Sequence, residues 1–185
     1  LSKKGFINRN SIKSSTATFS FTIPLTKVSQ NRKISEISTF NWIEYKNSLR
    51  KRICNTLTLA PNVDEALYVF DQVNCSNDIS ILELNRLALE AVCSKFKINS
   101  EIVLASEICN TESRGQNRII EICKELAATD YLNLPGGTKL YDKDKFERNG
   151  IKLKFIDQSL IALPTDCEFL RYSSVISAIA YGQKV

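Results

Sequence analysis

The spacing of apolar residues changes along this chain, and the change limits the folds that it can form. Between residues 17 and 25 every second residue is apolar: Ala17, Phe19, Phe21, Ile23 and Leu25. This alternation predicts a strand with one buried face, which ends near Pro24 or lies at a sheet edge because proline cannot donate a ladder hydrogen bond. With Phe6 and Ile7 before it, the strand predicts a β-hairpin or meander.

After this strand the apolar residues take the spacing of α-helices. The first predicted helix spans residues 41–57, and its buried face carries Trp42, Tyr45, Leu49 and Ile53. A second follows residues 60–62, where Asn62 and Glu65 have the spacing of a capping box, and buries Ala66, Leu67, Phe70 and Val73. A third covers residues 81–97 and buries Leu84, Leu87, Ala88, Ala91, Val92 and Phe96.

The second half of the chain alternates short apolar runs with a helical pattern. Residues 102–105 predict a short strand, and residues 115–128 predict a crossover helix with the buried stripe Ile119, Ile120, Cys123, Leu126 and Ala127. Residues 131–134 predict a strand parallel to the first, in a right-handed βαβ unit, and Leu153 with Phe155 predicts a further strand. The expected fold is α/β, with a mixed, partly parallel sheet covered by helices and a tendency toward a Rossmann-like three-layer arrangement.

Length and composition are those of one globular domain. The chain has 185 residues, 43% hydrophobic and 24% charged, which allows a sizeable core and is typical of folded proteins. Its apolar runs are far shorter than the ~18 residues that span a bilayer, and no basic leader with an apolar segment opens it. We expect a single domain over residues 1–185, no membrane span and a cytoplasmic location.

The histidine content, the cysteine spacing and the net charge limit the reactions and ligands that we expect. Histidine is absent, which removes the usual general base near neutral pH and the commonest zinc ligand. None of the six cysteines has CxxC spacing and several fall on apolar helix faces, so buried free thiols are favoured over disulfides. The net charge of +5 comes from basic residues scattered among 20 acidic ones, which argues against nucleic acid and fits a small anionic substrate.

Loops beyond the carboxyl ends of strands are the usual ligand sites of an open α/β sheet, which points to residues 106–116 and 133–141. In the second loop, Gly136 and Gly137 let the backbone approach a ligand, among the polar side chains Asn133, Thr138, Lys139, Tyr141 and Asp142. A tight turn is the alternative. In the first, Gly115 opens a helix that could receive a phosphate beside Arg114 or Arg118, although a turn glycine is favoured and no Walker or GxGxxG motif is present.

A second polar cluster lies near the start of the chain and comprises Lys4, Asn8, Arg9 and Asn10. The Arg9 guanidinium offers a fork for a carboxylate or phosphate, and the amides beside it can pair with sugar hydroxyls. An arginine that holds loop carbonyls is an equal alternative. Gln30 and Ser106 lie in two further polar segments, and without a histidine to activate Ser106 we predict no catalytic triad.

Three segments of the chain resemble the WbqC-like proteins, a bacterial family associated with O-antigen and other surface-polysaccharide gene clusters. These are KKGFINRN at residues 3–10, TIPLTKVSQNRKI at residues 22–34, and residues 115–157, where the family pattern falls on Asn133, Gly136, Gly137, Leu140, Tyr141 and Asp142. The chain departs from the family pattern in three places. Residues 60–63 lack the family's aromatic pair, residues 158–168 lack its histidine, and residues 171–182 lack its aspartate. The family's N-terminal strand and helix have no counterpart before Leu1, so we expect them to be missing from this sequence.

The resemblance implies a role in the biosynthesis of O-antigen, a part of lipopolysaccharide, or of a related surface polysaccharide. The expected protein is a transferase that modifies an activated amino sugar, by acyl or aminoacyl transfer to a nucleotide sugar. The alternative is a non-catalytic binding or assembly factor in the same pathway, and nucleotidyl transfer is a third interpretation.

Within the transferase interpretation, Asp142 is the candidate general base, and Tyr141 or Lys139 would stabilise developing negative charge. The expected substrate-binding residues are Lys4, Asn8, Arg9, Asn10, Gln30, Ser106, Arg118, Asn133, Gly136 and Gly137. No cofactor and no metal ligand is assigned, because Asp142 and Asp144 lie in a charged run that favours solvated carboxylates.

Overall fold

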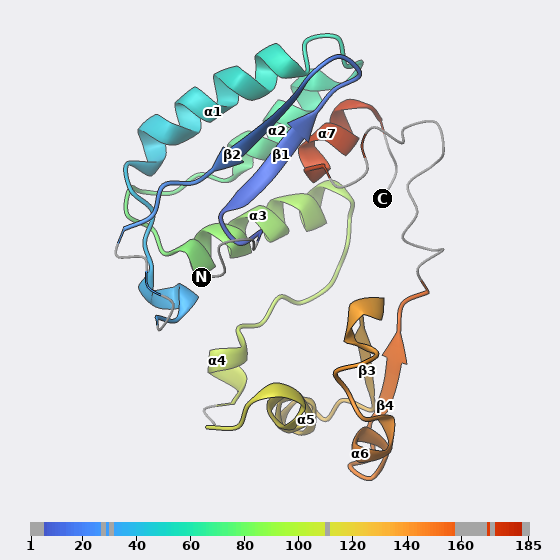
Figure 1. Cartoon of the computed structure of the whole chain (residues 1–185). Helices are drawn as coiled ribbons and strands as arrows, with labels where there is room; N and C mark the ends of the chain where they lie inside the picture. Colours follow the sequence, from blue (N-terminus) through green and yellow to red (C-terminus); the bar gives the residue numbers. More distant parts are fainter. Residues whose placement is uncertain are drawn as a thin grey trace. The chain divides into compact units, whose positions relative to one another are not determined.

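A computed structural model describes residues 6–26, 29, 32–109, 112–157, 170 and 173–182. Contacts within the chain define two compact units (Figure 1). Unit 1 is Leu1–Ser100 with Leu163–Val185, and unit 2 is Glu101–Ala162. Two contact units can belong to one domain, so the single domain over residues 1–185 stays a prediction. Each unit is described by itself.

The predicted hairpin is confirmed in unit 1. Strand β1 (Arg9–Lys13) pairs antiparallel with β2 (Thr18–Thr22), in a register that runs from Arg9 opposite Thr22 to Lys13 opposite Thr18. Because side chains alternate across a strand, Ile12, Phe19 and Phe21 lie on the face that packs against the helices. The other face is here called the polar face of the hairpin and carries Arg9, Ser11, Lys13, Thr18, Ser20 and Thr22.

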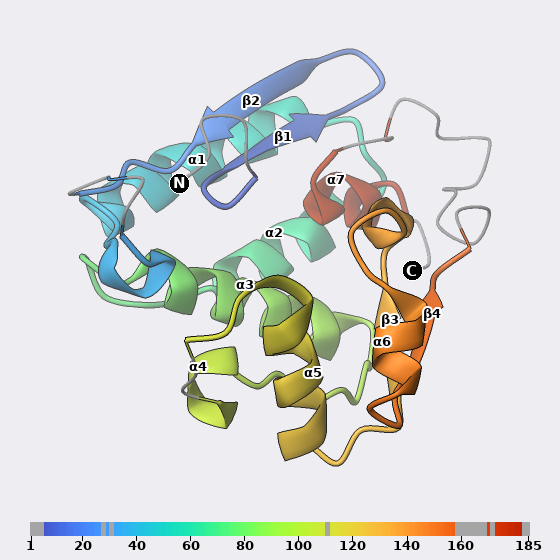
Figure 2. The same ribbon diagram turned by 60° about the horizontal axis from the view of Figure 1, so that its bottom comes forward.

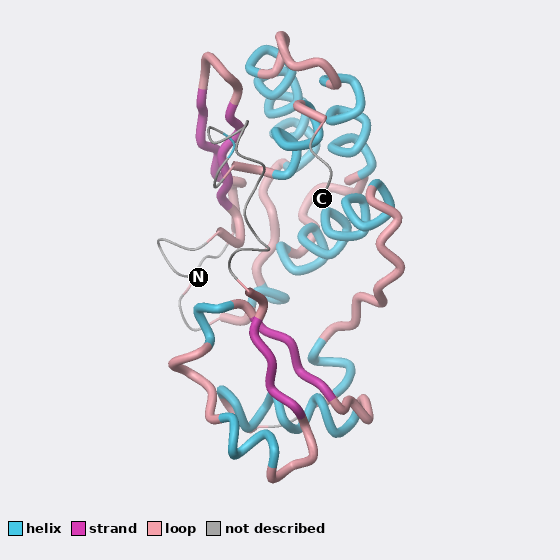
Figure 3. Tube along the Cα trace, turned by 90° about the vertical axis from the view of Figure 1, so that its right-hand side faces the viewer, coloured by secondary structure: helices cyan, strands magenta, loops and turns pink. Residues whose placement is uncertain are grey.

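Helices α1 (Trp42–Thr56), α2 (Val63–Gln72) and α3 (Ile81–Lys95) confirm the three predicted helices of unit 1. The short helices η1 (Ile34–Glu36) and α7 (Val175–Ala180) complete the unit. Figure 3 shows the hairpin as a separate layer along one side of the helices. The buried face of α1 joins two clusters, since Leu49 and Ile53 pack toward α2 and α7 whereas Trp42 packs toward α3.

The edge of β1 is covered by α7 and the residues that flank it. The backbone N–H of Lys13 donates to Ser177 Oγ at 2.9 Å, and Ser174 N–H donates to the carbonyl of Ser11 at 2.8 Å. Ser15 N–H donates to the Tyr181 hydroxyl at 3.0 Å. These bonds satisfy outward-facing backbone groups of β1 and tie the end of the chain to its first strand.

The predicted capping box at α2 is wrong. Asn62 occupies the N-cap position, but its side chain accepts no capping hydrogen bond. Instead its backbone N–H donates to Ala180 O at 2.9 Å. Its side-chain Nδ2 lies close to Gly182, 3.0 Å from the position that a Cβ atom on that residue would take. Packing against the end of α7 therefore takes this side chain away from the helix start.

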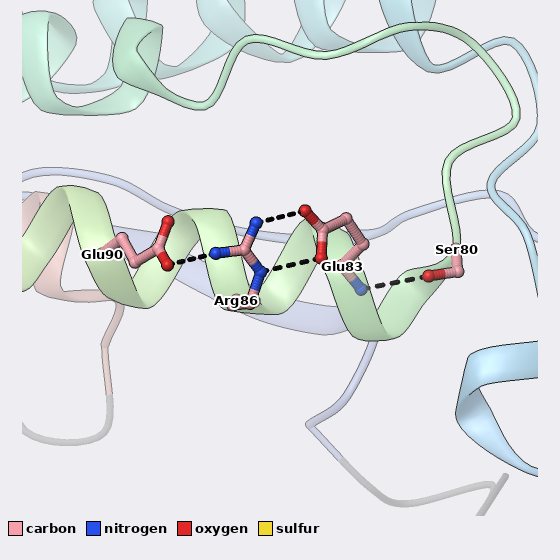
Figure 4. Close-up of polar contacts among 4 residues, drawn as sticks. All are labelled: Ser80, Glu83, Arg86 and Glu90. Carbon is pink, nitrogen blue, oxygen red and sulfur yellow. Dashed lines mark hydrogen bonds and ion pairs between the residues drawn. The ribbon is translucent and has the colours of Figure 1, made fainter. Parts of the chain in front are cut away.

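A capping serine starts α3, and an ion-pair series follows it on the same helix (Figure 4). Ser80 Oγ accepts from Glu83 N–H at 3.1 Å. Arg86 donates through Nε to Glu83 at 2.8 Å and also pairs with Glu90, one turn further on. The hydrogen bond from Arg86 lowers the pKa of Glu83. The series lies on a helix surface, where such pairs contribute little to stability.

Unit 2 contains one parallel strand pair, in which β3 (Asp130–Asn133) pairs with β4 (Lys152–Phe155) (Figure 2). Helices α4 (Ala105–Ile108), α5 (Gly115–Glu125), η2 (Pro135–Gly137) and α6 (Lys143–Glu147) surround it. The predicted strand at Leu153 and Phe155 is confirmed. One sheet face packs on α5 and α6 through the cluster Ile120, Cys123, Phe146, Ile151 and Leu153.

Two predictions for unit 2 need correction. Residues 102–105 form no strand, since irregular backbone leads directly into α4, so β3 pairs with β4 across a connection that contains α6. Helix α5 also ends earlier than predicted, and Leu126 is 52% exposed. Ala127 has a φ of 50°, and Ala128 N–H donates to Cys123 O at 2.8 Å, which is a Schellman ending.

The structure confirms the α/β class with a parallel strand pair, and it corrects the expected single sheet. The described strands form two separate two-stranded sheets, one antiparallel and one parallel. The five described cysteines (Cys54, Cys75, Cys93, Cys109 and Cys123) are free thiols, as predicted, but their predicted burial holds for Cys123 alone, since the other four are partly exposed. In the described part of the chain, every helix is too short or too polar to span a bilayer.

Candidate functional site

The glycine pair of unit 2 lies in the helical turn η2, and its two members have different surroundings. Gly136 is exposed and a Cβ there would have no atom within 4 Å. Gly137 is buried, and a Cβ there would lie 2.6 Å from Asn133 Nδ2 and 3.1 Å from the Tyr141 ring. Close packing inside the loop therefore requires the second glycine, without any contribution from a ligand.

Three aromatic rings pack against one another at this loop. The rings of Tyr131 and Phe146 are stacked with centroids 5.7 Å apart, and the Tyr141 ring meets both of them edge-on. Burial, with the charge and hydrogen bond of Tyr141 beside it, raises the pKa of Tyr131 to about 12. The Tyr131 phenol therefore stays neutral at physiological pH.

Asp142 is the N-cap of α6. Its side chain accepts from the backbone N–H groups of Asp144 at 3.0 Å and Lys145 at 3.3 Å, and its own N–H donates to Gln116 Oε1 at 3.0 Å. These bonds join the loop to the start of α5 and occupy one carboxylate oxygen. The fold thus accounts for an aspartate at this position, and Lys139 is exposed nearby in the sequence.

A second site lies in unit 1, on the polar face of the hairpin. A groove of about 350 Å³ is lined there by Phe6, Arg9, Asn10, Ser11, Ser20, Phe21 and Thr22, and is called the hairpin groove below. Its volume lies at the lower end of the ~300–1,000 Å³ typical of small-molecule sites. Of the described residues, Arg9 is the only charged one that lines it. Among the described residues, the Arg9 guanidinium has no recorded ion pair or hydrogen bond.

The two asparagines beside Arg9 have different roles. Asn8 Nδ2 donates to Ile23 O at 3.0 Å, which secures the end of the hairpin, so this side chain is structural. Asn10 lines the hairpin groove, where its Oδ1 accepts from Ser11 N–H at 2.8 Å and its amide nitrogen remains a donor. Both alternatives for Arg9, a ligand-binding guanidinium and one that holds loop carbonyls, stay predictions.

Comparison with known proteins identifies the family. The model of the WbqC-like protein family matches residues 1–183. The chain belongs to the WbqC-like protein family. No curated protein and no solved structure matches it.

In this WbqC-like protein, the predicted site residues fall into one group in each unit. Unit 1 places Arg9 and Asn10 in the hairpin groove, whereas Lys4 and Gln30 lie outside the described residues. Unit 2 gathers Asn133, Gly136, Gly137, Tyr141 and Asp142 in one loop. The other three candidates of unit 2 are Lys139, exposed in the same loop, Ser106, exposed on α4, and Arg118, half-buried on α5.

Several residues of both sites were missed by the sequence analysis. In the hairpin groove these are Phe6, Ser11, Ser20, Phe21 and Thr22. Three of them share the polar face with Arg9, a relation that the alternation of strand residues would have revealed once the hairpin register was known. In the loop of unit 2, Gln116 was missed because its contact with Asp142 spans 26 positions.

Gly115 illustrates how backbone conformation decides between interpretations. Its φ is +57°, in the left-handed region that favours glycine. This conformation explains the glycine as a turn residue at the start of α5, the interpretation that the sequence favoured. Among the described residues, no three His, Cys, Asp or Glu side chains gather in a way that could hold a metal ion.

The capping bonds of Asp142 lead to a stability prediction. Asp142→Ala removes both acceptor contacts and is expected to lower the free energy of unfolding of unit 2 by about 1 kcal/mol. Asp142→Asn keeps an acceptor oxygen at the same place and is expected to stay close to wild type. Thermal unfolding of the two variants, with hydrogen exchange of α6, measures the difference; equal loss in both would contradict the capping role.

Proposed function

We propose that this WbqC-like protein is a cytoplasmic transferase of surface-polysaccharide biosynthesis that modifies an activated amino sugar. The observation that supports the proposal is the hairpin groove, where Arg9, which has no ion pair with another described residue, lies among hydroxyl and amide side chains. A guanidinium binds phosphate oxygens in pairs, and the hydroxyls of Ser20 and Thr22 each supply a donor and acceptors for sugar hydroxyls.

The aromatic lining of the groove also fits a sugar. Phe6 lines the groove and is 81% exposed. An aromatic ring covers the apolar C–H face of a pyranose, while neighbouring hydroxyls pair with its equatorial groups. One cation, several hydroxyls and an exposed ring together suit a phosphorylated sugar better than a hydrophobic ligand.

Arg9→Gln tests the groove, because it removes the charge and keeps polar atoms. We expect the variant to bind glucose 1-phosphate and UDP-N-acetylglucosamine about tenfold or more weakly than wild type, as for the loss of a charged hydrogen bond. Isothermal titration measures the affinity. Arg32→Gln is the matched control, since Arg32 is exposed in unit 1 and does not line the groove. Equal affinity in wild type and Arg9→Gln would overturn the proposal that Arg9 binds the phosphate in this groove.

The catalytic part of the proposal rests on Asp142 as general base, with Lys139 or Tyr141 as partners of developing negative charge. Asp142→Asn keeps the N-cap but cannot accept a proton, so it separates chemistry from stability. Turnover is measured as acyl or aminoacyl transfer to the nucleotide sugar by mass spectrometry. Full turnover in a folded Asp142→Asn protein would remove Asp142 from the mechanism.

A non-catalytic binding or assembly factor is the second candidate function. It is favoured by the contacts of the unit 2 loop, because capping by Asp142 and packing by Tyr141 and Gly137 explain these residues without chemistry. Binding of a sugar phosphate that depends on Arg9, together with no product from any nucleotide sugar and acyl donor, would favour this candidate over the transferase.

A further inference from the structure

A second groove in unit 1 lies at the N-terminal end of α1. It has a volume of about 260 Å³ and is here called the α1 groove; it is lined by Pro24, Phe40, Asn41, Glu44, Tyr45 and Ser48. None of these residues belongs to the sites described above. The groove is formed by the chain that leaves β2 and by the first turns of α1, so both of its walls belong to the same unit.

The α1 groove carries a negative charge, whereas the hairpin groove carries a positive one. Among the described residues, Glu44 is the only charged one that lines the α1 groove, and its carboxylate forms no ion pair or hydrogen bond with any of them. Two aromatic side chains accompany it: Phe40, which is 52% exposed, and the half-buried Tyr45. A carboxylate beside aromatic rings attracts an ammonium group through an ion pair and through the negative faces of the rings.

Backbone contacts hold the walls of this groove in place. Phe40 N–H donates to Pro24 O at 2.9 Å, and Tyr45 N–H donates to Asn41 O at 3.0 Å. The Tyr45 ring lies beside that of the buried Trp42, with centroids 6.4 Å apart. The aromatic wall is therefore pre-organised, which lowers the entropy lost when a ligand binds.

The two grooves are neighbours at the end of β2. Thr22 lines the hairpin groove, and Pro24, two residues further along the chain, lines the α1 groove. Among the described residues, the arginine that lines the first groove and the glutamate that lines the second both lack an ion-pair partner. This arrangement suits a small ligand that carries both a negative and a positive group.

We propose that the α1 groove binds the ammonium group of an unacylated amino sugar whose phosphate is held at Arg9. This inference rests on the proposed function and names its substrate class: an amino sugar phosphate with a free amine. An N-acetylated sugar lacks the charge that Glu44 would recognise, and a neutral sugar lacks the nitrogen as well.

Isothermal titration with three sugar phosphates tests the proposal on the full chain. Wild type is expected to bind glucosamine 1-phosphate roughly three- to tenfold more tightly than N-acetylglucosamine 1-phosphate or glucose 1-phosphate. Glu44→Gln is expected to abolish this preference and to leave the weaker affinity for the two amine-free ligands. Arg9→Gln is expected to weaken the binding of all three by a similar factor.

Asp64→Asn is the matched control. Asp64 lies in the first turn of α2 as Glu44 lies in the first turn of α1, so both substitutions remove one carboxylate from a helix start. Asp64 does not line the α1 groove, and its variant is expected to keep the preference for the amine. Unfolding temperatures of both variants show that a changed affinity does not come from a changed fold.

The outcomes separate this proposal from the proposed function. Equal affinity of wild type for the three ligands, or a preference that persists in Glu44→Gln, would overturn the amine site while a loss in Arg9→Gln still supports the phosphate site. Glucosamine without phosphate is the fourth probe. If wild type binds glucosamine and only Glu44→Gln loses this binding, the result would support the amine site even if Arg9 had no role. If wild type binds neither glucosamine nor glucosamine 1-phosphate, the amine site would be overturned.

Discussion

Replacing Phe146 by Ala is expected to lower the free energy of unfolding of unit 2 by about 3–5 kcal/mol, as for other buried phenylalanines. Phe146 is 0% exposed, and its ring stacks on Tyr131 at 5.7 Å between centroids. It lies at the centre of the cluster that joins α5, α6 and β4. A sheet of two strands has few other buried residues, so the cavity cannot be filled by repacking.

Hydrogen exchange resolved by segment is the appropriate measurement, because a chain with two units need not unfold in one step. Amide groups of α5 and β3 are expected to exchange about a hundredfold faster or more in Phe146→Ala. The only tryptophan, Trp42, is buried in unit 1, so its fluorescence reports separately on that unit. Leu140→Ala is the control at a side chain that is 73% exposed, and unchanged exchange in Phe146→Ala would contradict the assignment of this core.

The second large effect is expected at Gly137. A Cβ added there would meet Asn133 Nδ2 at 2.6 Å and the Tyr141 ring at 3.1 Å, so one of these groups must move. Neither moves freely, since Asn133 Oδ1 accepts from Leu134 N–H at 2.8 Å and the Tyr141 ring packs edge-on against Phe146. Overpacking of this kind costs about 1–3 kcal/mol, and we expect Gly137→Ala to destabilise unit 2 by that amount.

Gly136→Ala is the matched control for Gly137→Ala. It makes the same chemical change one residue away, where no atom lies within 4 Å of the added carbon. Its stability is expected to equal or slightly exceed that of wild type, because alanine restricts the unfolded chain more than glycine does. Thermal unfolding of both variants gives the comparison. Equal destabilisation would mean that the backbone, rather than the contact with Asn133 and Tyr141, requires glycine in this turn.

The pair also tests what the loop is for. If the glycines were there to admit a ligand to the backbone, both substitutions would weaken ligand binding at the loop. If only packing requires glycine, Gly136→Ala would keep wild-type activity in the transferase assay, and Gly137→Ala would lose activity in proportion to its stability.

Local pattern was sufficient for much of the fold. The alternation before Pro24 predicted β2, and the helical stripes through Leu49, Leu84 and Ile120 predicted α1, α3 and α5, because periodicity reports which face of an element is buried. Arg9 could also be selected as a candidate from its residue type and neighbours, since a guanidinium between two amides has few local roles.

Contacts between distant segments decided the rest. The partner of β3 is β4 and not residues 102–105, a choice that depends on which apolar faces meet around Phe146. Asn62 faces α7 rather than its own helix. The hairpin groove exists because β1 pairs with β2, and the α1 groove exists because the chain that follows β2 lies next to α1; no spacing along the chain encodes these contacts. Residue patterns determine local burial, whereas pairing and grooves follow from packing across the whole unit.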